Sequence, residues 1–247
     1  MALRFRPYPG FTIATLILTA VLIGLGVWQL ERLQWKLALI AEVNGHMAAA
    51  PISLDQALKT DADRMQYRRV ALSGHLDNAK ESYVFTTGAG GEPVYHVITP
   101  FVTDEGRTML VDRGFVPKER LDPKTRTPVE GDTRLVGVWR VPDAPGAFTP
   151  APDMAHRIWY ARDVESIAAT DQIRLAAPVL IEADAAPNPG GWPKGGQTVV
   201  SFRNEHLSYA ITWFGLAAGL IGVSMIACLV PAQSVARIDP SRVLRDE

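Results

Sequence analysis

Long apolar runs occupy both ends of the 247-residue chain, and the pattern between them is polar. Residues 11–30 form one run without a charge, and residues 207–230 form a second. A helix rises about 1.5 Å per residue, so either run is long enough to cross a hydrocarbon layer of about 30 Å. The pattern predicts two transmembrane α-helices, with residues 1–10 and 231–247 beyond them and an extramembrane domain over residues 31–206.

The helical period continues for a short distance after the first run. Apolar residues recur at spacings of three and four up to Ile40, which extends the helix to about Val43, and Asn44-Gly45 is expected to end it. Ser53 and Gln56 then form a capping box for a short helix.

From Tyr67 onward apolar positions recur every second residue, which is typical of strands. The predicted strands are residues 67–76, 81–87, 94–103, 108–115, 134–141, 159–160, 178–182 and 198–202. Residues 104–107 are expected to form a hairpin turn, and residues 164–169 a short helix capped by Asp163. Short strands with tight links predict an antiparallel, β-rich domain of the α+β class, either a barrel or a sandwich.

Charge and cysteine content narrow the function. The formal net charge of −1 gives no electrostatic case for binding nucleic acid. The single cysteine, Cys228, lies in the second run, which excludes an intrachain disulfide and a cysteine metal site. The histidines outside the apolar runs are scattered, and no nucleophile motif is present, so an enzyme is the least favoured class.

Basic residues near the ends predict the orientation of the chain. Arg4 and Arg6 precede the first run, and Arg237, Arg242 and Arg245 follow the second, which places both termini in the cytoplasm. The first run exceeds the usual length of a signal-peptide core, and the residues before it form no transit peptide. A bacterial inner membrane with the central domain in the periplasm is therefore expected.

Two central segments are candidates for docking a partner. Asp112 and Arg113 end a predicted strand as an exposed pair, and Gly114 allows a bend or a close backbone approach. Either the pair is an intramolecular ion pair or it docks a partner. The glycine-rich residues 187–197 lack the order of a phosphate loop and are either a surface loop or a docking loop.

The sharpest cluster lies where the second helix enters the membrane. At about 100° per residue, His206, Tyr209 and Trp213 form one stripe. Three glycines occupy the opposite face, which is suited to close helix packing: Gly215, Gly219 and Gly222.

The first helix carries a matching group at similar depth, formed by Trp28, Arg32 and Trp35. These aromatic residues have two interpretations. Trp and Tyr form ordinary interfacial belts, but a histidine at the edge of hydrocarbon suits axial ligation of haem iron, with Arg32 or Arg203 pairing with propionates.

Eight motifs in order resemble the Surfeit-locus family of cytochrome c oxidase assembly factors. They are Leu25-Gly-Val-Trp-Gln-Leu-Glu-Arg with Trp35-Lys36, Tyr67-Arg-Arg-Val with Gly74, Val97-Ile-Thr-Pro-Phe, Leu110-Val-Asp-Arg-Gly-Phe-Val-Pro, Gly137-Val-Trp-Arg, Trp159-Tyr-Ala-Arg-Asp, Gly195-Gly-Gln-Thr and Arg203-Asn-Glu-His-Leu-Ser-Tyr-Ala-Ile-Thr-Trp.

The resemblance implies a chaperone of respiratory complex IV biogenesis that acts through oxidase subunit I. It also implies transient haem a binding, with His206 as the iron ligand and Trp213 assisting, and haem A synthase as a further partner. Two other hypotheses stay open. One is a haem-independent scaffold for nascent subunit I, and the other is a membrane-anchored periplasmic enzyme.

Overall fold

The computed structural model describes residues 9–88, 90–142, 144–198, 200 and 202–229. The chain divides into two compact units. One comprises Met1–Ile40 with Phe202–Glu247, and the other comprises Ala41–Ser201.

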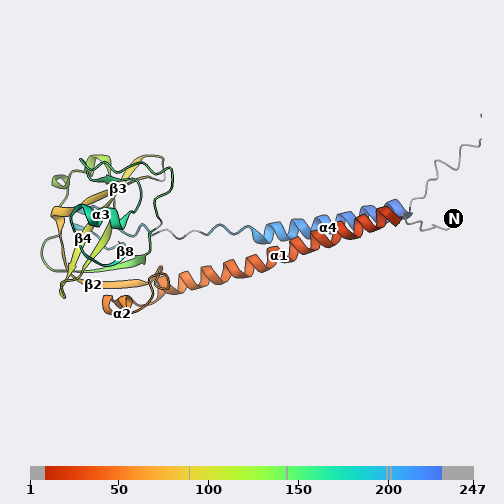
Figure 1. Cartoon of the computed structure of the whole chain (residues 1–247), viewed down its shortest axis with the longest axis horizontal. Coiled ribbons are helices and arrows are strands. Elements are labelled where there is room, and N and C mark those ends of the chain that lie inside the picture. Colours follow the sequence, from red (N-terminus) through yellow and green to blue (C-terminus); the bar gives the residue numbers. More distant parts are fainter. Residues whose placement is uncertain (1–8, 89, 143, 199, 201, 230–247) are drawn as a thin grey trace, which may run out of the picture. The chain divides into compact units, whose positions relative to one another are not determined.

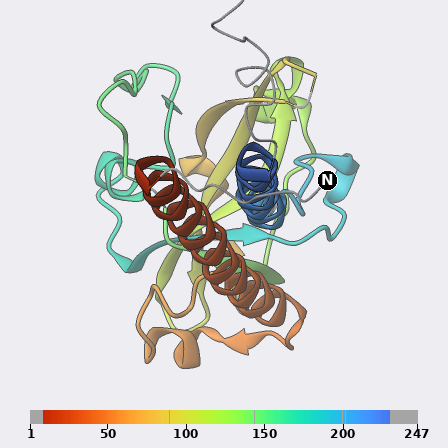
Figure 2. The same cartoon turned by 90° about the vertical axis from the view of Figure 1, so that its right-hand side faces the viewer.

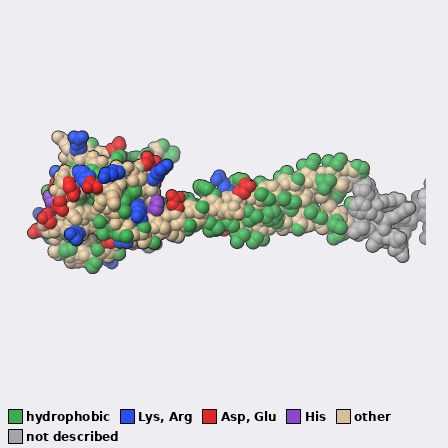
Figure 3. Space-filling view, turned by 90° about the horizontal axis from the view of Figure 1, so that it is seen from below, with side chains coloured by type: hydrophobic (Ala, Val, Ile, Leu, Met, Phe, Trp, Pro, Cys, Tyr) green, Lys and Arg blue, Asp and Glu red, His purple; other side chains and the backbone are tan. Residues whose placement is uncertain are grey.

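Two helices make up most of the described part of the first unit: α1, Pro9–Ala48, whose last turns belong to the second unit, and α4, His206–Leu229. Both are long and apolar enough to cross a membrane. Apolar side chains cover the helical segments in Figure 3, whereas charged side chains gather over the central unit. The two predicted apolar helices are confirmed as helices by the structure.

Helix α1 ends later than the sequence predicts. Asn44-Gly45 does not stop it, and the helix continues to Ala48. A glycine inside a helix costs only about 1 kcal/mol. Burial of Val43 and a 2.9 Å contact between His46 Nδ1 and the Gln66 carbonyl hold this last turn in place.

Helices α1 and α4 pack antiparallel along a seam of small and polar residues. Thr15 Oγ1 lies 3.2 Å from Ser224 Oγ. Nearer the start of α4, the Phe214 ring lies against Gly26, where an added Cβ would be 2.7 Å from ring carbons. The glycine of α1 therefore provides the space that the bulky residue of α4 requires.

The glycine face of α4, which the sequence marks as suited to close helix packing, is not the face that packs against α1. A Cβ added at Gly215, Gly219 or Gly222 would meet no atom within 4 Å. Instead, Ala210 and Ala217 are buried on the face that contacts α1. Small residues permit close approach, but the glycine needed at the tightest crossing is supplied by α1.

The central unit is a small barrel. Its strands are β1 Ile52–Ser53, β2 Arg69–Leu76, β3 Ser82–Thr87, β4 Pro93–Thr103, β5 Thr108–Pro117, β6 Thr133–Arg140, β7 Ile158–Trp159 and β8 Leu175–Ala183. The order β2-β6-β8-β5-β4 closes because β4 also pairs with β2. Strands β4 and β5 run side by side in yellow-green in Figure 2. Of the two architectures that the pattern left open, the structure has the barrel.

The sheet is mixed rather than wholly antiparallel. The β5–β8, β1–β2 and β3–β7 pairs are parallel. A parallel pair needs a long crossover, and the chain between β5 and β8 supplies one. The predicted strand at residues 198–202 is also wrong for its described residues 198, 200 and 202, which lie outside strands. Both edges of β8 are already paired with β5 and β6, so no edge is free there.

Two short helices, α2 and α3, lie beside the strands of the central unit (Figure 1). Helix α2, Leu54–Leu58, begins at the predicted capping box and contributes Leu54 to the barrel core, which includes Phe101 and Trp139. Helix α3, Val164–Thr170, begins at the predicted cap Asp163 and packs on the outer face of the sheet. Single 3₁₀ turns occur at Asn78–Lys80, Lys118–Arg120, Pro123–Thr125 and Pro189–Gly191.

Candidate functional site

His206 is the first residue of α4 and contacts α1 directly. Its Nδ1 lies 2.7 Å from Oε1 of Gln29, a side chain that is buried in the helix seam. Nε2 has no hydrogen-bond partner in the described part of the chain and is not among its enclosed polar atoms. One ring nitrogen is therefore held by the protein, and the other stays available to a ligand.

Trp213 lies on the same side of α4 as His206, about two turns further into the apolar segment. Its indole Nε1 is buried and has no hydrogen-bond partner among the described residues. Tyr209, in contrast, is about half exposed. The predicted stripe is thus divided: His206 and Trp213 are partly covered, and Tyr209 faces outward.

The three predicted residues of α1 come together. The Arg32 guanidinium carbon lies 5.7 Å from the Trp28 ring centroid and 5.4 Å from that of Trp35. Both indoles are about half exposed, and cation–π contacts of this kind hold a guanidinium over an aromatic surface. Arg32 makes no salt bridge within the described residues, whereas Arg203 pairs with Glu205 at 3.1 Å.

Asp112 and Arg113 are not an exposed pair, so this prediction is wrong. Both side chains are about 3% exposed. Adjacent residues of a strand point to opposite faces, and each side chain enters a different buried cluster. Their assignment to partner docking stays a prediction, but neither side chain is on the surface in this structure.

Asp112 is surrounded by donors. His96 Nδ1 lies 2.8 Å from Oδ2, the Gly114 backbone N–H donates to Oδ1 at 2.9 Å, and Arg162 lies 3.5 Å away. Burial on its own raises the pKa of this carboxyl. The hydrogen bond from His96 and the charges of His96 and Arg162 outweigh burial and lower the pKa below its ordinary value.

Arg113 enters a second cluster on the other face of β5. It donates to Glu81 Oε1 at 2.9 Å, and Arg126 donates to Glu81 Oε2 at 2.7 Å. Burial lowers the pKa of Arg113. Burial, with the charge of Glu81, raises the pKa of the neighbouring Tyr83 phenol to about 12. The central position of Glu81 is invisible in the sequence because its partners are 32 and 45 residues away.

Gly114 adopts a positive φ of 105° where the glycine-rich segment lies against β5. A Cβ there would be 1.9 Å from the Lys194 carbonyl oxygen. Phe115 and Lys194 form an isolated bridge, and the Trp192 ring packs on Phe115. The close backbone approach predicted for Gly114 is therefore confirmed, and it fixes part of the 187–197 segment to the barrel.

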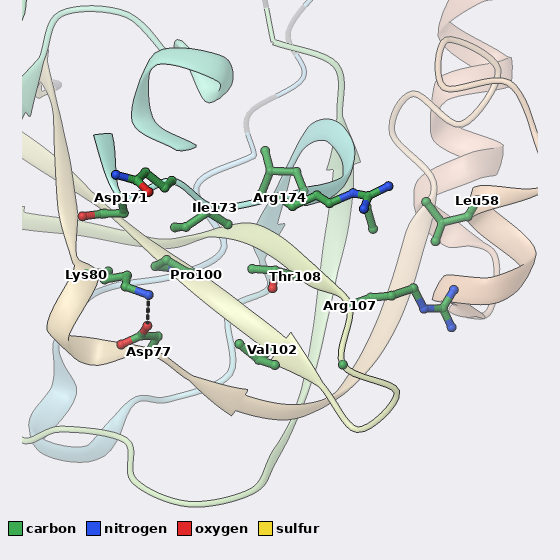
Figure 4. A pocket seen from close by; sticks show the side chains of 14 residues that line it. Leu58, Asp77, Lys80, Pro100, Val102, Arg107, Thr108, Asp171, Ile173 and Arg174 are labelled. Carbon is green, nitrogen blue, oxygen red and sulfur yellow. Dashed lines mark ion pairs between the residues drawn. The ribbon is translucent and has the colours of Figure 1, made fainter. Parts of the chain in front are cut away.

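A cavity of about 620 Å³ opens in the central unit beside β4 and the start of β8 (Figure 4). Four of its five charged side chains, all except Arg174, are in ion pairs among the described residues. Lys80 pairs with Asp77, Arg107 pairs with Asp55, and Asp171 pairs with Arg157. The lining therefore offers little unpaired charge to an ionic ligand. The cluster on α1 and α4 that includes Arg32, His206 and Trp213 remains the stronger candidate site.

The fold and the site define a class of protein with a small β-barrel domain whose sequence is flanked by two helices long enough to cross a membrane. The second of these helices begins at a half-buried histidine. The family model described as the SURF1 family matches residues 16–218. The chain belongs to the SURF1 family. It is 40% identical to mouse Surfeit locus protein 1 over 82% of this chain and 71% of that protein. Identity to the human protein is 37%, covering 82% and 72%, and to the Takifugu rubripes protein 39%, covering 82% and 90%.

Proposed function

We propose that this protein is an assembly factor for haem a-containing cytochrome c oxidase, and that it assists haem a insertion into subunit I or the maturation of that subunit. Membership of the SURF1 family supports the assembly role. One observation supports the haem step. On the same side of α4, His206 Nε2 is available to a ligand, and the buried Trp213 Nε1 has no hydrogen-bond partner among the described residues.

The residues present fit a haem group. A haem iron needs as little as one axial ligand from the protein, so a cluster of three metal ligands, absent among the described residues, is not required. His206 would supply that ligand through Nε2, and Trp213 Nε1 would donate a hydrogen bond. Arg32, which has no carboxylate partner among the described side chains, would pair with an anionic propionate.

Haem a, when bound, supplies the iron and the anionic edge that these residues recognise. The exposed rings of Tyr209 and Trp28 would cover its apolar surface. The protein itself performs no turnover in this proposal. It holds haem with moderate affinity, because a donor that binds too tightly does not release its cargo.

The proposed setting is a bacterial inner membrane, with both termini cytoplasmic and the barrel in the periplasm. Haem A synthase would supply the haem, and oxidase subunit I would receive it. The barrel would dock these membrane partners, while membrane lipid surrounds α1 and α4. Nucleic acid is not a partner in this proposal, since the net charge is −1.

A visible spectrum of the detergent-purified chain, produced together with the haem A synthesis enzymes, tests the haem step. We expect a haem a band in the wild type and its loss in His206→Ala. His75→Ala is a matched control, because His75 is exposed on β2, and it should keep the band. Circular dichroism verifies that all three proteins are folded.

Undiminished haem in His206→Ala would contradict the ligand assignment. No band in any of the proteins, with haem A present in the membranes, would instead favour the haem-independent scaffold. Co-purification of subunit I with the wild-type chain would then be the decisive measurement.

A further inference from the structure

Gln29 is a buried amide in an otherwise apolar stretch of α1. Its exposed fraction is 9%, and its Oε1 lies 2.7 Å from His206 Nδ1. Burying an amide without a hydrogen bond costs free energy, and polar residues within membrane-crossing helices tend to serve a function. The contact with His206 satisfies the amide oxygen and also constrains the imidazole.

We infer that Gln29 is a positioning residue that fixes His206 in the Nδ1–H tautomer and so keeps Nε2 as a free lone pair. An amide oxygen only accepts hydrogen bonds, so the short contact places the proton on Nδ1. A neutral imidazole carries one ring proton, and Nε2 is therefore left as an acceptor. The tautomer is independent of the haem proposal, whereas its consequence for binding rests on that proposal.

This arrangement is the one that metal-binding histidines use. Their second ring nitrogen usually donates to a carbonyl or carboxylate, which sets the ring orientation and strengthens the ligand. Loss of such a partner typically lowers metal affinity about 10–100-fold. The same contact ties the start of α4 to α1, so Gln29 would present His206 in one orientation before any ligand arrives.

The opposite amide orientation gives a different result. The Gln29 NH₂ group would then donate to Nδ1, the proton would lie on Nε2, and His206 would have no free lone pair for iron. The two orientations are distinguished by the tautomer of His206.

The test compares Gln29→Met, which removes the acceptor at similar length, with Gln29→Glu, which retains an acceptor. Gln34→Met makes the same change at an exposed position of α1 and is the matched control. The first readout is ¹⁵N NMR of the full chain with labelled histidine, without haem, at about pH 8, where ordinary imidazoles are neutral. His206→Ala identifies the His206 signals among the five histidines.

We expect Nδ1–H in the wild type, Gln29→Glu and Gln34→Met, and a loss of this preference in Gln29→Met. The second readout is the dissociation constant for haem a, which should rise about 10–100-fold in Gln29→Met. Gln29→Glu and Gln34→Met should stay close to the wild type. Circular dichroism of each variant verifies its helix content.

A wild-type His206 with its proton on Nε2 would overturn the inference, whatever the haem result. A lost tautomer preference in Gln29→Met with unchanged haem affinity would overturn the positioning role. A wild type that shows Nδ1–H but binds no haem a would overturn the proposed haem step and leave the tautomer assignment standing.

Discussion

Asp112 stays charged in the interior because its neighbours offset the cost of burial. The carboxylate accepts from His96 and from the Gly114 backbone, and Arg162 lies nearby. These contacts hold the pKa below the ordinary value of 3.8. Since the folded state prefers the charged form, the carboxylate stabilises the fold above that ordinary value. The stabilisation is lost as pH falls through the lower, folded pKa.

Replacing Asp112 should therefore destabilise the barrel in a pH-dependent way. We expect Asp112→Asn to lower the free energy of unfolding by about 3–5 kcal/mol at neutral pH, as is typical of a broken buried pair. The gap from the wild type should shrink below about pH 4. Denaturant unfolding of the full chain in detergent, followed by circular dichroism between neutral and acid pH, measures it. Asp132→Asn, at an exposed position, is the control, and an equal gap at all pH values would contradict the prediction.

The sequence locates Asp112 and Arg113 correctly on a strand but does not identify their partners. Adjacent letters suggest a pair, whereas the pleat separates the two side chains. Glu81, which accepts a hydrogen bond from Arg113, immediately precedes β3, and this link exists only after β3, β4 and β5 have paired. The same limit hides Gln29 beside His206, because these residues are 177 positions apart.

At the scale of elements, the position of the glycine-rich segment 187–197 depends on its contact with β5 at Gly114. At Gly114 a side chain meets both an unfavourable φ and the Lys194 carbonyl, whereas at Gly106 the φ is 76° and nothing lies within 4 Å. We expect Gly106→Ala to cost about 1–2 kcal/mol of stability, from φ alone. Gly114→Ala should cost a further 1–3 kcal/mol or so, which is typical of steric overlap.

Limited proteolysis of residues 187–197, alongside denaturant unfolding, measures whether the segment is released. Gly114→Ala should be cleaved faster there, and Gly106→Ala should match the wild type. Equal losses of stability in the two variants would mean that the approach of Lys194 contributes nothing beyond backbone strain.

The sequence predicts which elements form more reliably than it predicts which of their faces pack together. Alternation in β2 and the caps of α2 and α3 are local signals, and the structure reproduces them. The packing face of α4 is not a local signal. It depends on Gly26 of α1, which accommodates Phe214, whereas the glycines of α4 meet no described atom within 4 Å.

For the whole molecule, the pattern predicts a β-rich domain between two apolar helices but not how the barrel closes. Closure depends on the pairing of only three residues of β2 with β4, Gly74 with Thr103, His75 with Val102 and Leu76 with Phe101. Such pairing arises from the combined twist and register of several strands. The parallel β5–β8 pair likewise depends on a crossover whose path no single segment encodes.

Orientation in the membrane is the property of the whole chain that its charges predict most directly. Both ends of the chain carry basic residues: Arg4 and Arg6 precede the first apolar run, and Arg237, Arg242 and Arg245 follow the second. This distribution favours the same, cytoplasmic, side for both termini. The barrel would then face the periplasm. A thiol placed on the barrel should react from outside the cell membrane, and a thiol placed in the C-terminal tail should not.

The native thiol, Cys228, is buried in the helix seam, so Cys228→Ala provides a background without reactive thiols. Phe148→Cys places a probe at a fully exposed position of the central unit, and Ser234→Cys places one in the tail, outside the described residues. In spheroplasts treated with a membrane-impermeant maleimide, we expect Phe148→Cys to be labelled at once and Ser234→Cys only after lysis. The reverse pattern would invert the orientation. Labelling of both probes before lysis would contradict a two-span topology, because two crossings place the barrel and the tail on opposite sides of one membrane.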